Sequence, residues 1–170
     1  MDLAAIIRDV PDFPVEGVLF KDITPLLRDP AAYHQAVIQL VDHYRDQRVD
    51  QVLAIESRGF IFGAPLAIEL HAGFVPVRKP GKLPSQTIAV EYTLEYGSNR
   101  LEMHTDAIRP GERVLVVDDL LATGGSAKAA IELAETLGGQ VVGAAFVVEL
   151  LALKGIERLA GYPVYSLVKF

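Results

Sequence analysis

Apolar residues recur along this chain in two patterns, as short unbroken runs and as positions spaced like one face of a helix. The unbroken runs, which are typical of strands buried on both sides of a sheet, lie at 51–55, 74–77, 114–117 and 141–148. The helically spaced stretches lie before and between them, at 31–45, 59–70 and 127–137. This alternation predicts an α/β fold in which helices flank a mainly parallel, twisted sheet.

Capping and turn residues set the expected ends of several elements. Asp29 followed by Pro30 is typical of an N-cap and a first helical residue, and the pair Gly138-Gly139 is expected to end the later helix. Residues 88–96 and 100–104 alternate well enough to form an antiparallel pair around a turn. Because no repeat or low-complexity linker interrupts the chain, residues 1–170 are interpreted as one domain.

The N-terminal segment is expected to stand apart from this alternation. Asp2 is placed to cap a short helix that runs to Arg8. Residues that break helices follow at once, at Pro11, Pro14 and Gly17.

The composition narrows the class of protein. The chain has 170 residues, of which 51% are hydrophobic, enough for a real core. It has no cysteine, so neither disulfides nor a thiolate metal site can form. We see no apolar run of about 18 residues and no basic, apolar leader, so we expect a soluble cytoplasmic protein without membrane contact.

Charge is informative both overall and locally. The formal net charge of −6 argues against nucleic acid as a partner, since such proteins usually carry a basic face. A local basic cluster nevertheless lies at 78–82, where Arg78, Lys79 and Lys82 surround Pro80 and Gly81. A small anionic ligand therefore remains compatible with the sequence.

The strongest chemical signal is the stretch from Val114 to Ser126, VLVVDDLLATGGS. A buried strand is expected to run into Asp118 and Asp119, and a loop of small residues then leads into a helix. Helix starts present unpaired N–H groups, glycines allow close backbone approach, and hydroxyls add donors, so the loop suits a phosphate monoester. Its residues are Ala122, Thr123, Gly124, Gly125 and Ser126.

The two carboxylates have a different use, because ionised carboxylates only accept hydrogen bonds. Asp118 and Asp119 suit sugar hydroxyls or a magnesium ion rather than a bare phosphate. Taken alone, two acids could serve solubility and two glycines could simply make a turn. Their combination in this order favours a site for a phosphate and a neighbouring diol.

Other motifs point to no competing chemistry. The chain contains neither the phosphate-loop pattern GxxxxGK[ST], nor GxGxxG, HExxH or GxSxG. Its four histidines lack the spacing of metal ligands. A phospho-receiver domain would also pair acids after a strand, but its acids should lie near the N-terminus, and no lysine follows the late strand.

The 114–126 stretch resembles the signature with which type I phosphoribosyltransferases bind phosphoribosyl pyrophosphate (PRPP). Three further segments agree in the expected order: 13–23 with the family's base-binding hood, 56–60 with its pyrophosphate loop, and 78–84 with 92–97 with its mobile catalytic loop. Lys21 and Glu56 depart slightly, because arginine and aspartate are frequent there. The resemblance implies the type I fold, with a small N-terminal hood at about 1–30 and an antiparallel mobile loop at about 79–98.

The resemblance also implies roles for individual residues. Glu95 is the implied catalytic acid or base, and Leu19, Phe20, Lys21 and Leu150 are implied to hold adenine. Pyrophosphate is implied to bind Ser57, Arg58, Arg78, Lys79 and Lys82, next to a non-proline cis peptide. The phosphate and ribose of PRPP or AMP are assigned to Asp118, Asp119 and residues 122–126.

The expected reaction joins adenine to PRPP, giving AMP and pyrophosphate, with Mg²⁺ accompanying the pyrophosphate and a homodimer as the assembly. No metal ligand among the side chains is assigned. Two alternatives stay open: a family member that uses hypoxanthine, guanine, xanthine or orotate, and a non-catalytic sensor of PRPP.

Overall fold

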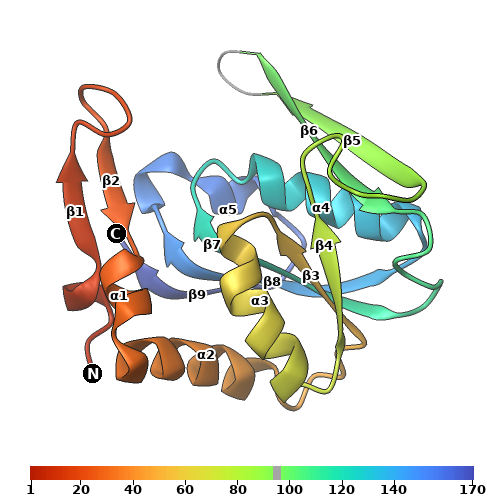
Figure 1. The fold of residues 1–170 in the computed structure, drawn as a ribbon, viewed down its shortest axis with the longest axis horizontal. Helices are drawn as coiled ribbons and strands as arrows, with labels where there is room; N and C mark the ends of the chain where they lie inside the picture. Colours follow the sequence, from red (N-terminus) through yellow and green to blue (C-terminus); the bar gives the residue numbers. More distant parts are fainter. Residues whose placement is uncertain (94–96) are drawn as a thin grey trace.

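A five-stranded parallel sheet, in the order β4-β3-β7-β8-β9, forms the centre of the molecule (Figure 1). The computed structural model describes residues 1–93 and 97–170. The strands are β3 Gln51–Ile55, β4 Gly73–Val77, β7 Arg113–Leu121, β8 Gln140–Glu149 and β9 Val164–Lys169. The predicted α/β class is confirmed, although β9 was not among the expected strands.

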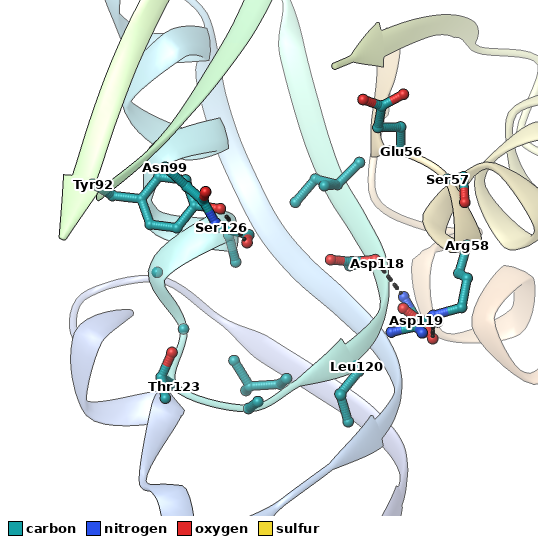
Figure 2. Close-up of a pocket in the computed structure, with 16 residues that line it drawn as sticks. Glu56, Ser57, Arg58, Tyr92, Asn99, Asp118, Asp119, Leu120, Thr123 and Ser126 are labelled. Carbon is teal, nitrogen blue, oxygen red and sulfur yellow. Dashed lines mark hydrogen bonds and ion pairs between the residues drawn. The ribbon is translucent and has the colours of Figure 1, made fainter. Parts of the chain in front are cut away.

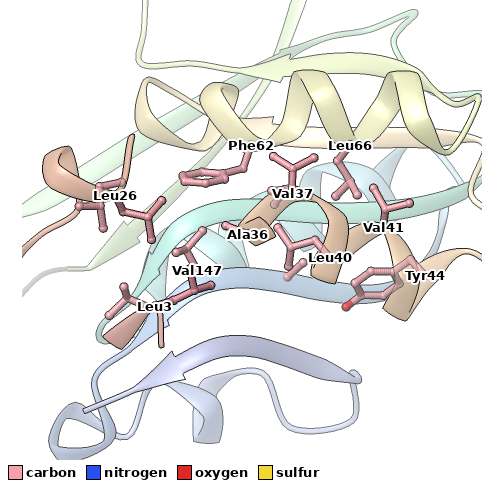
Figure 3. Close-up of a cluster of buried hydrophobic side chains, with 14 of the residues drawn as sticks. Leu3, Leu26, Ala36, Val37, Leu40, Val41, Tyr44, Phe62, Leu66 and Val147 are labelled. Atoms are coloured by element: carbon pink, nitrogen blue, oxygen red, sulfur yellow. The ribbon is translucent and has the colours of Figure 1, made fainter. Parts of the chain in front are cut away.

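Alternate residues of each strand face opposite sides of the sheet, and each side has its own core. Leu115 and Val117 pack with α2 (Pro30–Tyr44) and α3 (Arg58–Glu69), in the cluster that Figure 3 shows in part. Val114 and Val116 pack instead with α4 (Gly125–Thr136). Because both sides are covered, the strands read as unbroken apolar runs.

Two antiparallel pairs stand away from the sheet, at the left and the upper right of Figure 1. The first pairs β1 (Arg8–Pro11) with β2 (Leu19–Asp22), within the segment 1–30 that was expected to form the hood. The second, which we call the ribbon, pairs β5 (Thr87–Thr93) with β6 (Ser98–His104). The expectation of a strand over 88–96 is confirmed to Thr93, and its last three positions lie outside the described residues.

The expected helix to Arg8 is wrong. A single 3-10 turn, η1 (Ala4–Ile6), follows Asp2, and Arg8 already pairs with Asp22 in the hood. Pairing with β2 gives the backbone its hydrogen bonds, so no helix is needed to satisfy these groups. Asp29, by contrast, caps α2 as expected, because its Oδ1 accepts from the N–H groups of Ala31 and Ala32 at 2.9 and 3.1 Å.

Strand β7 is longer than expected, and this moves the two acids into the strand. Asp118 pairs with Phe146 and Leu120 with Val148, so the ladder with β8 continues beyond the apolar run. The polar side chains do not end the strand, since the pairing with β8 continues on both sides of Asp119.

The remaining short helices are α1 (Thr24–Arg28), η2 (Leu151–Leu153) and α5 (Gly155–Arg158). Over residues 1–93 and 97–170, we find no helix with the length and apolarity needed to cross a membrane.

Candidate active site

A cavity of about 380 Å³ opens beyond the carboxyl ends of β3 and β7 (Figure 2). Three segments line it: the β3–α3 turn, the end of β7 with the following loop, and the ribbon. Ligands in open parallel sheets bind at this edge. The neighbouring positions of β3 and β7 bring two distant parts of the sequence to one site.

The loop from Ala122 to Ser126 ends on the N-terminus of α4. Gly124 has a φ of 83°, and a Cβ there would lie 2.5 Å from the Gly155 carbonyl oxygen, so a side chain is excluded twice over. Within the described residues, no side chain caps this helix start. Its first N–H groups are therefore free to bind an anion, as the sequence predicted for a phosphate.

The ribbon reaches the same loop through Tyr92. Its ring packs against Gly125, where a Cβ would lie 2.9 Å from the ring carbon Cδ2. Its hydroxyl lies 3.0 Å from the Ser126 hydroxyl. Gly125 thus accommodates an aromatic ring of this protein, whereas the sequence had suggested that the glycine makes room for a ligand.

The two acids differ in their surroundings, as Figure 2 shows. Asp119 is buried, and its Oδ2 lies 2.6 Å from Nε of Arg58. Asp118 accepts the Asp119 N–H at 2.8 Å. Burial, followed by repulsion from Asp119, raises the pKa of Asp118 well above its usual range. The site therefore contains one acid that is paired with Arg58 and one acid whose ionisation is disfavoured.

The β3–α3 turn carries Glu56, whose carboxylate gathers several basic groups. Its oxygens lie 2.9 Å from Nη2 of Arg78 and 3.5 Å from Nζ of Lys82, and they accept the Lys79 N–H at 2.7 Å. Burial alone would raise the pKa of Glu56, but these hydrogen bonds and charges together lower it. The Glu56–Ser57 peptide bond is cis, as the resemblance implies.

The basic cluster is therefore arranged differently from what the sequence suggested. Arg78 and Lys82 contact Glu56 rather than pointing freely into the pocket, and Lys79 uses its backbone. None of the three lines the cavity described above. The sequence could not show this, because Glu56 follows β3 whereas the cluster follows β4.

None of the four residues assigned to adenine is among those that line the cavity. Phe20 contacts Phe13 edge to face at 5.1 Å between ring centroids, and the Arg58 guanidinium lies 5.8 Å from the Phe20 ring. Lys21 pairs with Asp9 and lies over the Phe170 ring. Leu19 is half exposed, and Leu150 packs against the core next to α2 and α3.

The structure brings most of the remaining predicted residues together around the cavity. They are Ser57, Arg58, Asp118, Asp119, Ala122, Thr123, Gly124, Gly125 and Ser126. Sequence reasoning missed Tyr92 and Asn99, which face each other across the ribbon and also line the cavity. The alternation of Ile88, Val90 and Tyr92 on one face of the ribbon was the available signal. Glu95 lies outside the described residues.

Comparison with protein families matches the phosphoribosyl transferase domain to residues 27–162 of this chain. The chain is 54% identical over 169 residues to the adenine phosphoribosyltransferase of Halothermothrix orenii, covering 99% of each protein. It is 57% identical to that of Chloroflexus aurantiacus, covering 99% of this chain and 98% of the relative.

Solved structures similar to this chain are also adenine phosphoribosyltransferases. The adenine phosphoribosyltransferase of Thermoanaerobacter pseudethanolicus superposes with a TM-score of 0.96 at 50% identity, covering 99% of this chain and 98% of the other. The Saccharomyces cerevisiae protein, solved in complex with an imino-altritol bisphosphate and adenine, gives a TM-score of 0.91 at 41% identity. That match covers 97% of this chain and 96% of the other.

Proposed function

The chain belongs to the phosphoribosyltransferase family, and from that premise we infer that it transfers the phosphoribosyl group of PRPP to adenine. The products are AMP and pyrophosphate, and the reaction is a step of purine salvage. The observation that carries this inference is the cavity itself, where a free helix start and two carboxylates meet. A phosphate ester and a sugar diol are the groups that such a pair of features recognises.

We propose that the 5′-phosphate binds the loop from Ala122 to Ser126. The uncapped N–H groups of α4 supply donors, and the Thr123 and Ser126 hydroxyls add to them. Asp118 and Asp119 then accept hydrogen bonds from the ribose hydroxyls. A sugar hydroxyl that donates to Asp118 favours its ionised form, which burial and the charge of Asp119 disfavour.

The leaving pyrophosphate is assigned to Ser57, Arg58, Arg78, Lys79 and Lys82. In this structure, Arg58 is paired with Asp119, while Arg78 and Lys82 are paired with Glu56. Pyrophosphate binding therefore exchanges one partner of these cations for another. Such an exchange costs less desolvation than burying unpaired charge, and it also lets the product leave.

Adenine is assigned to the hood, between Phe20 and Leu150, with backbone groups of Leu19 and Lys21 at the edge of the base. Flat bases stack well on aromatic rings. The Arg58 guanidinium lies near the Phe20 ring, so the hood and the pyrophosphate turn are neighbours in this structure. That arrangement supports the placement of the base next to the anomeric carbon of the sugar.

The chemistry needs no covalent intermediate with the protein. A purine nitrogen attacks the anomeric carbon as pyrophosphate departs, through a transition state with positive charge on the ribose ring. The carboxylates of Asp118 and Asp119 stabilise that charge, and the loops fix the geometry. Glu95 is proposed to handle the proton of the base.

Mg²⁺ is proposed to accompany the pyrophosphate group. In residues 1–93 and 97–170, we find no group of three His, Cys, Asp or Glu side chains suited to a metal ion. The carboxylates of Asp118 and Asp119 nevertheless fit the ion chemically, because Mg²⁺ prefers oxygen ligands and usually binds through one or two carboxylates and substrate phosphates. Once bound, the ion neutralises charge on the leaving group.

We also propose that the protein is a homodimer, as the resemblance to its family implies. We propose a cytoplasmic location as well, with which the lack of cysteine agrees. Sedimentation of the purified protein over a range of concentrations tests the assembly.

A direct assay tests the function. Purified protein is mixed with adenine, PRPP and Mg²⁺, and AMP is measured, with hypoxanthine, guanine, xanthine and orotate as competing bases. AMP should form, and adenine should be preferred. Binding of PRPP without pyrophosphate release would instead indicate a sensor. The double variant Asp118→Asn, Asp119→Asn serves as control, and it should keep the fold and lose most turnover.

A further inference from the structure

Tyr92, on the ribbon, contacts Ser126 in the 122–126 loop, and the reaction proposed above gives this contact no role. Tyr92 lies 34 residues before Ser126 in the chain, yet their hydroxyl oxygens are 3.0 Å apart. Tyr92 comes from β5, and Ser126 from the first turn of α4. Both line the cavity.

The ring of Tyr92 is fixed by packing, so its hydroxyl position is well defined. Ile88, Val90 and Tyr92 pack on the same core as α4. The ring also fills the space in front of Gly125, where a Cβ would lie within 2.9 Å of it. A residue larger than glycine at 125 would push Tyr92 away, so this glycine and the tyrosine act as one packing unit.

The need to bind a phosphate then decides which of the two hydroxyls donates in the Tyr92–Ser126 hydrogen bond. Each hydroxyl has one donor hydrogen, and either oxygen can donate to the other. A phosphate is an acceptor, so Ser126 must use its own hydrogen to bind one. Tyr92 is then left as the donor to Ser126, and hydrogen bonds in such a chain strengthen one another.

We propose that Tyr92 is a positioning residue for the 5′-phosphate. It holds the Ser126 hydroxyl with its hydrogen directed to the phosphate, and it ties the ribbon to the phosphate loop in the same contact. This inference rests on the proposed function, because it takes the ligand of the 122–126 loop to be the 5′-phosphate of AMP or PRPP. It goes further in naming a group outside the loop that orients a loop hydroxyl.

The test compares ligands with and without the phosphate. Tyr92→Phe keeps the ring on Gly125 and removes the hydroxyl. AMP affinity should fall about threefold to tenfold, the effect of one net hydrogen bond, while adenosine affinity stays unchanged. Isothermal titration calorimetry measures both affinities. A variant that lost both equally would show a general packing effect and overturn the proposal.

A double-mutant cycle separates positioning from independent contributions. Ser126→Ala should weaken AMP binding by itself, and adding Tyr92→Phe should then cost little more, because the hydroxyl that Tyr92 orients is gone. Additive losses would overturn the proposal. Steady-state kinetics give a second readout, since Tyr92→Phe should raise the KM for PRPP by a similar factor and leave the KM for adenine unchanged.

Tyr162→Phe is the matched control. Its hydroxyl donates to Glu135 at 2.6 Å, outside the residues that line the cavity. This variant should leave the affinity for AMP unchanged. If the wild-type chain binds no AMP at all, the proposed function and this inference both fail. If the wild-type chain binds AMP and Tyr92→Phe binds it equally well, the inference alone fails.

Discussion

Two strand-to-helix connections meet in the cavity, one after β3 and one after β7, and they present charge in different ways. The β3–α3 turn uses side chains, Glu56 and Arg58, and each of them is already paired with an opposite charge. The 122–126 loop has no ionisable side chain and presents the start of α4 instead. The charged side chains must exchange one ion-pair partner for another when a ligand binds. The backbone N–H groups at the start of α4 need no such exchange.

This difference suits the two anions that we assign to them. Pyrophosphate must enter and leave in each turnover, so cations with alternative partners keep the exchange close to balanced. The 5′-phosphate stays on the sugar throughout, so a fixed set of N–H donors serves as its anchor. Asp118 and Asp119 lie between the two connections and link them through the Arg58–Asp119 pair.

The largest effect is expected at the acids between the connections. Asp118→Asn should cut turnover by about a hundredfold or more, the scale on which a preorganised polar group contributes to catalysis. The same change should stabilise the ligand-free protein at neutral pH. The pKa of Asp118 is raised on folding, so ionisation costs stability; this cost is absent below about pH 4 and grows as the pH rises through the folded pKa. Asparagine keeps the acceptor for the Asp119 N–H and carries no charge.

Asp50→Asn is the control with the opposite sign. The Arg113 N–H bound to Asp50 lowers its pKa, so its contribution to stability is present above about pH 4 and is lost as the pH falls through the folded pKa. Urea denaturation at pH 4 and pH 7.5 measures both variants. If Asp118→Asn is destabilised at pH 7.5, burial of the carboxylate is not costly and our account of this acid is wrong.

The next effect is expected in the 122–126 loop. Gly124→Ala should lower AMP affinity by about tenfold or more, because the new Cβ would meet the Gly155 carbonyl oxygen and shift the loop. Gly111→Ala is the matched control, because Gly111 has a similar φ of 85° and open space around its Cβ position. It should cost about 1–2 kcal/mol of stability through backbone strain and leave AMP binding intact. Calorimetric titration measures AMP affinity, and denaturation measures stability. Equal AMP affinities in Gly124→Ala and Gly111→Ala would show that the loop binds AMP even when it is displaced.

A smaller effect is expected in the paired turn. Glu56→Gln should increase pyrophosphate affinity a fewfold, because Arg78 and Lys82 lose a competing charge. The pKa of Glu56 is lowered on folding, so its stabilising contribution is present above about pH 4.3 and is lost below the folded pKa. The variant should therefore be less stable than the wild type at pH 7 and equal to it in strong acid. Weaker pyrophosphate binding in the variant would show that Glu56 orients the cations for the ligand rather than competing with it.

The smallest effect is expected at Lys79. Its contact with Glu56 uses the backbone N–H, which Lys79→Ala retains, so stability should change by no more than about 0.5 kcal/mol. Arg78→Ala removes a side chain that donates to Glu56 and to the Lys82 carbonyl. It should therefore raise the KM for PRPP more than Lys79→Ala does. Thermal melts and steady-state kinetics compare the two variants. A larger rise of the KM in Lys79→Ala would show that the Lys79 side chain contacts the pyrophosphate more closely than the Arg78 side chain does.

Local signals in the sequence were enough to predict the elements that depend on neighbouring residues. Unbroken apolar runs predicted β3, β4, β7 and β8, and Asp29 predicted the start of α2. The stretch from Val114 to Ser126 predicted the loop on α4 and its two acids. In each case the signal lies within a few residues, because burial pattern, capping and helix starts are local properties.

Contacts between charged groups and between hydroxyls, by contrast, follow from the way the chain folds in three dimensions. Arg58 meets Asp119, Glu56 meets Arg78, and Tyr92 meets Ser126, although these residues lie on separate elements. Arg8 joins a strand instead of a helix because Asp22 lies opposite it in the hood. Such pairs follow from strand order and from the packing of α4 against the ribbon. Residue spacing along the chain does not record them, since a contact between distant segments depends on how the whole sheet is assembled.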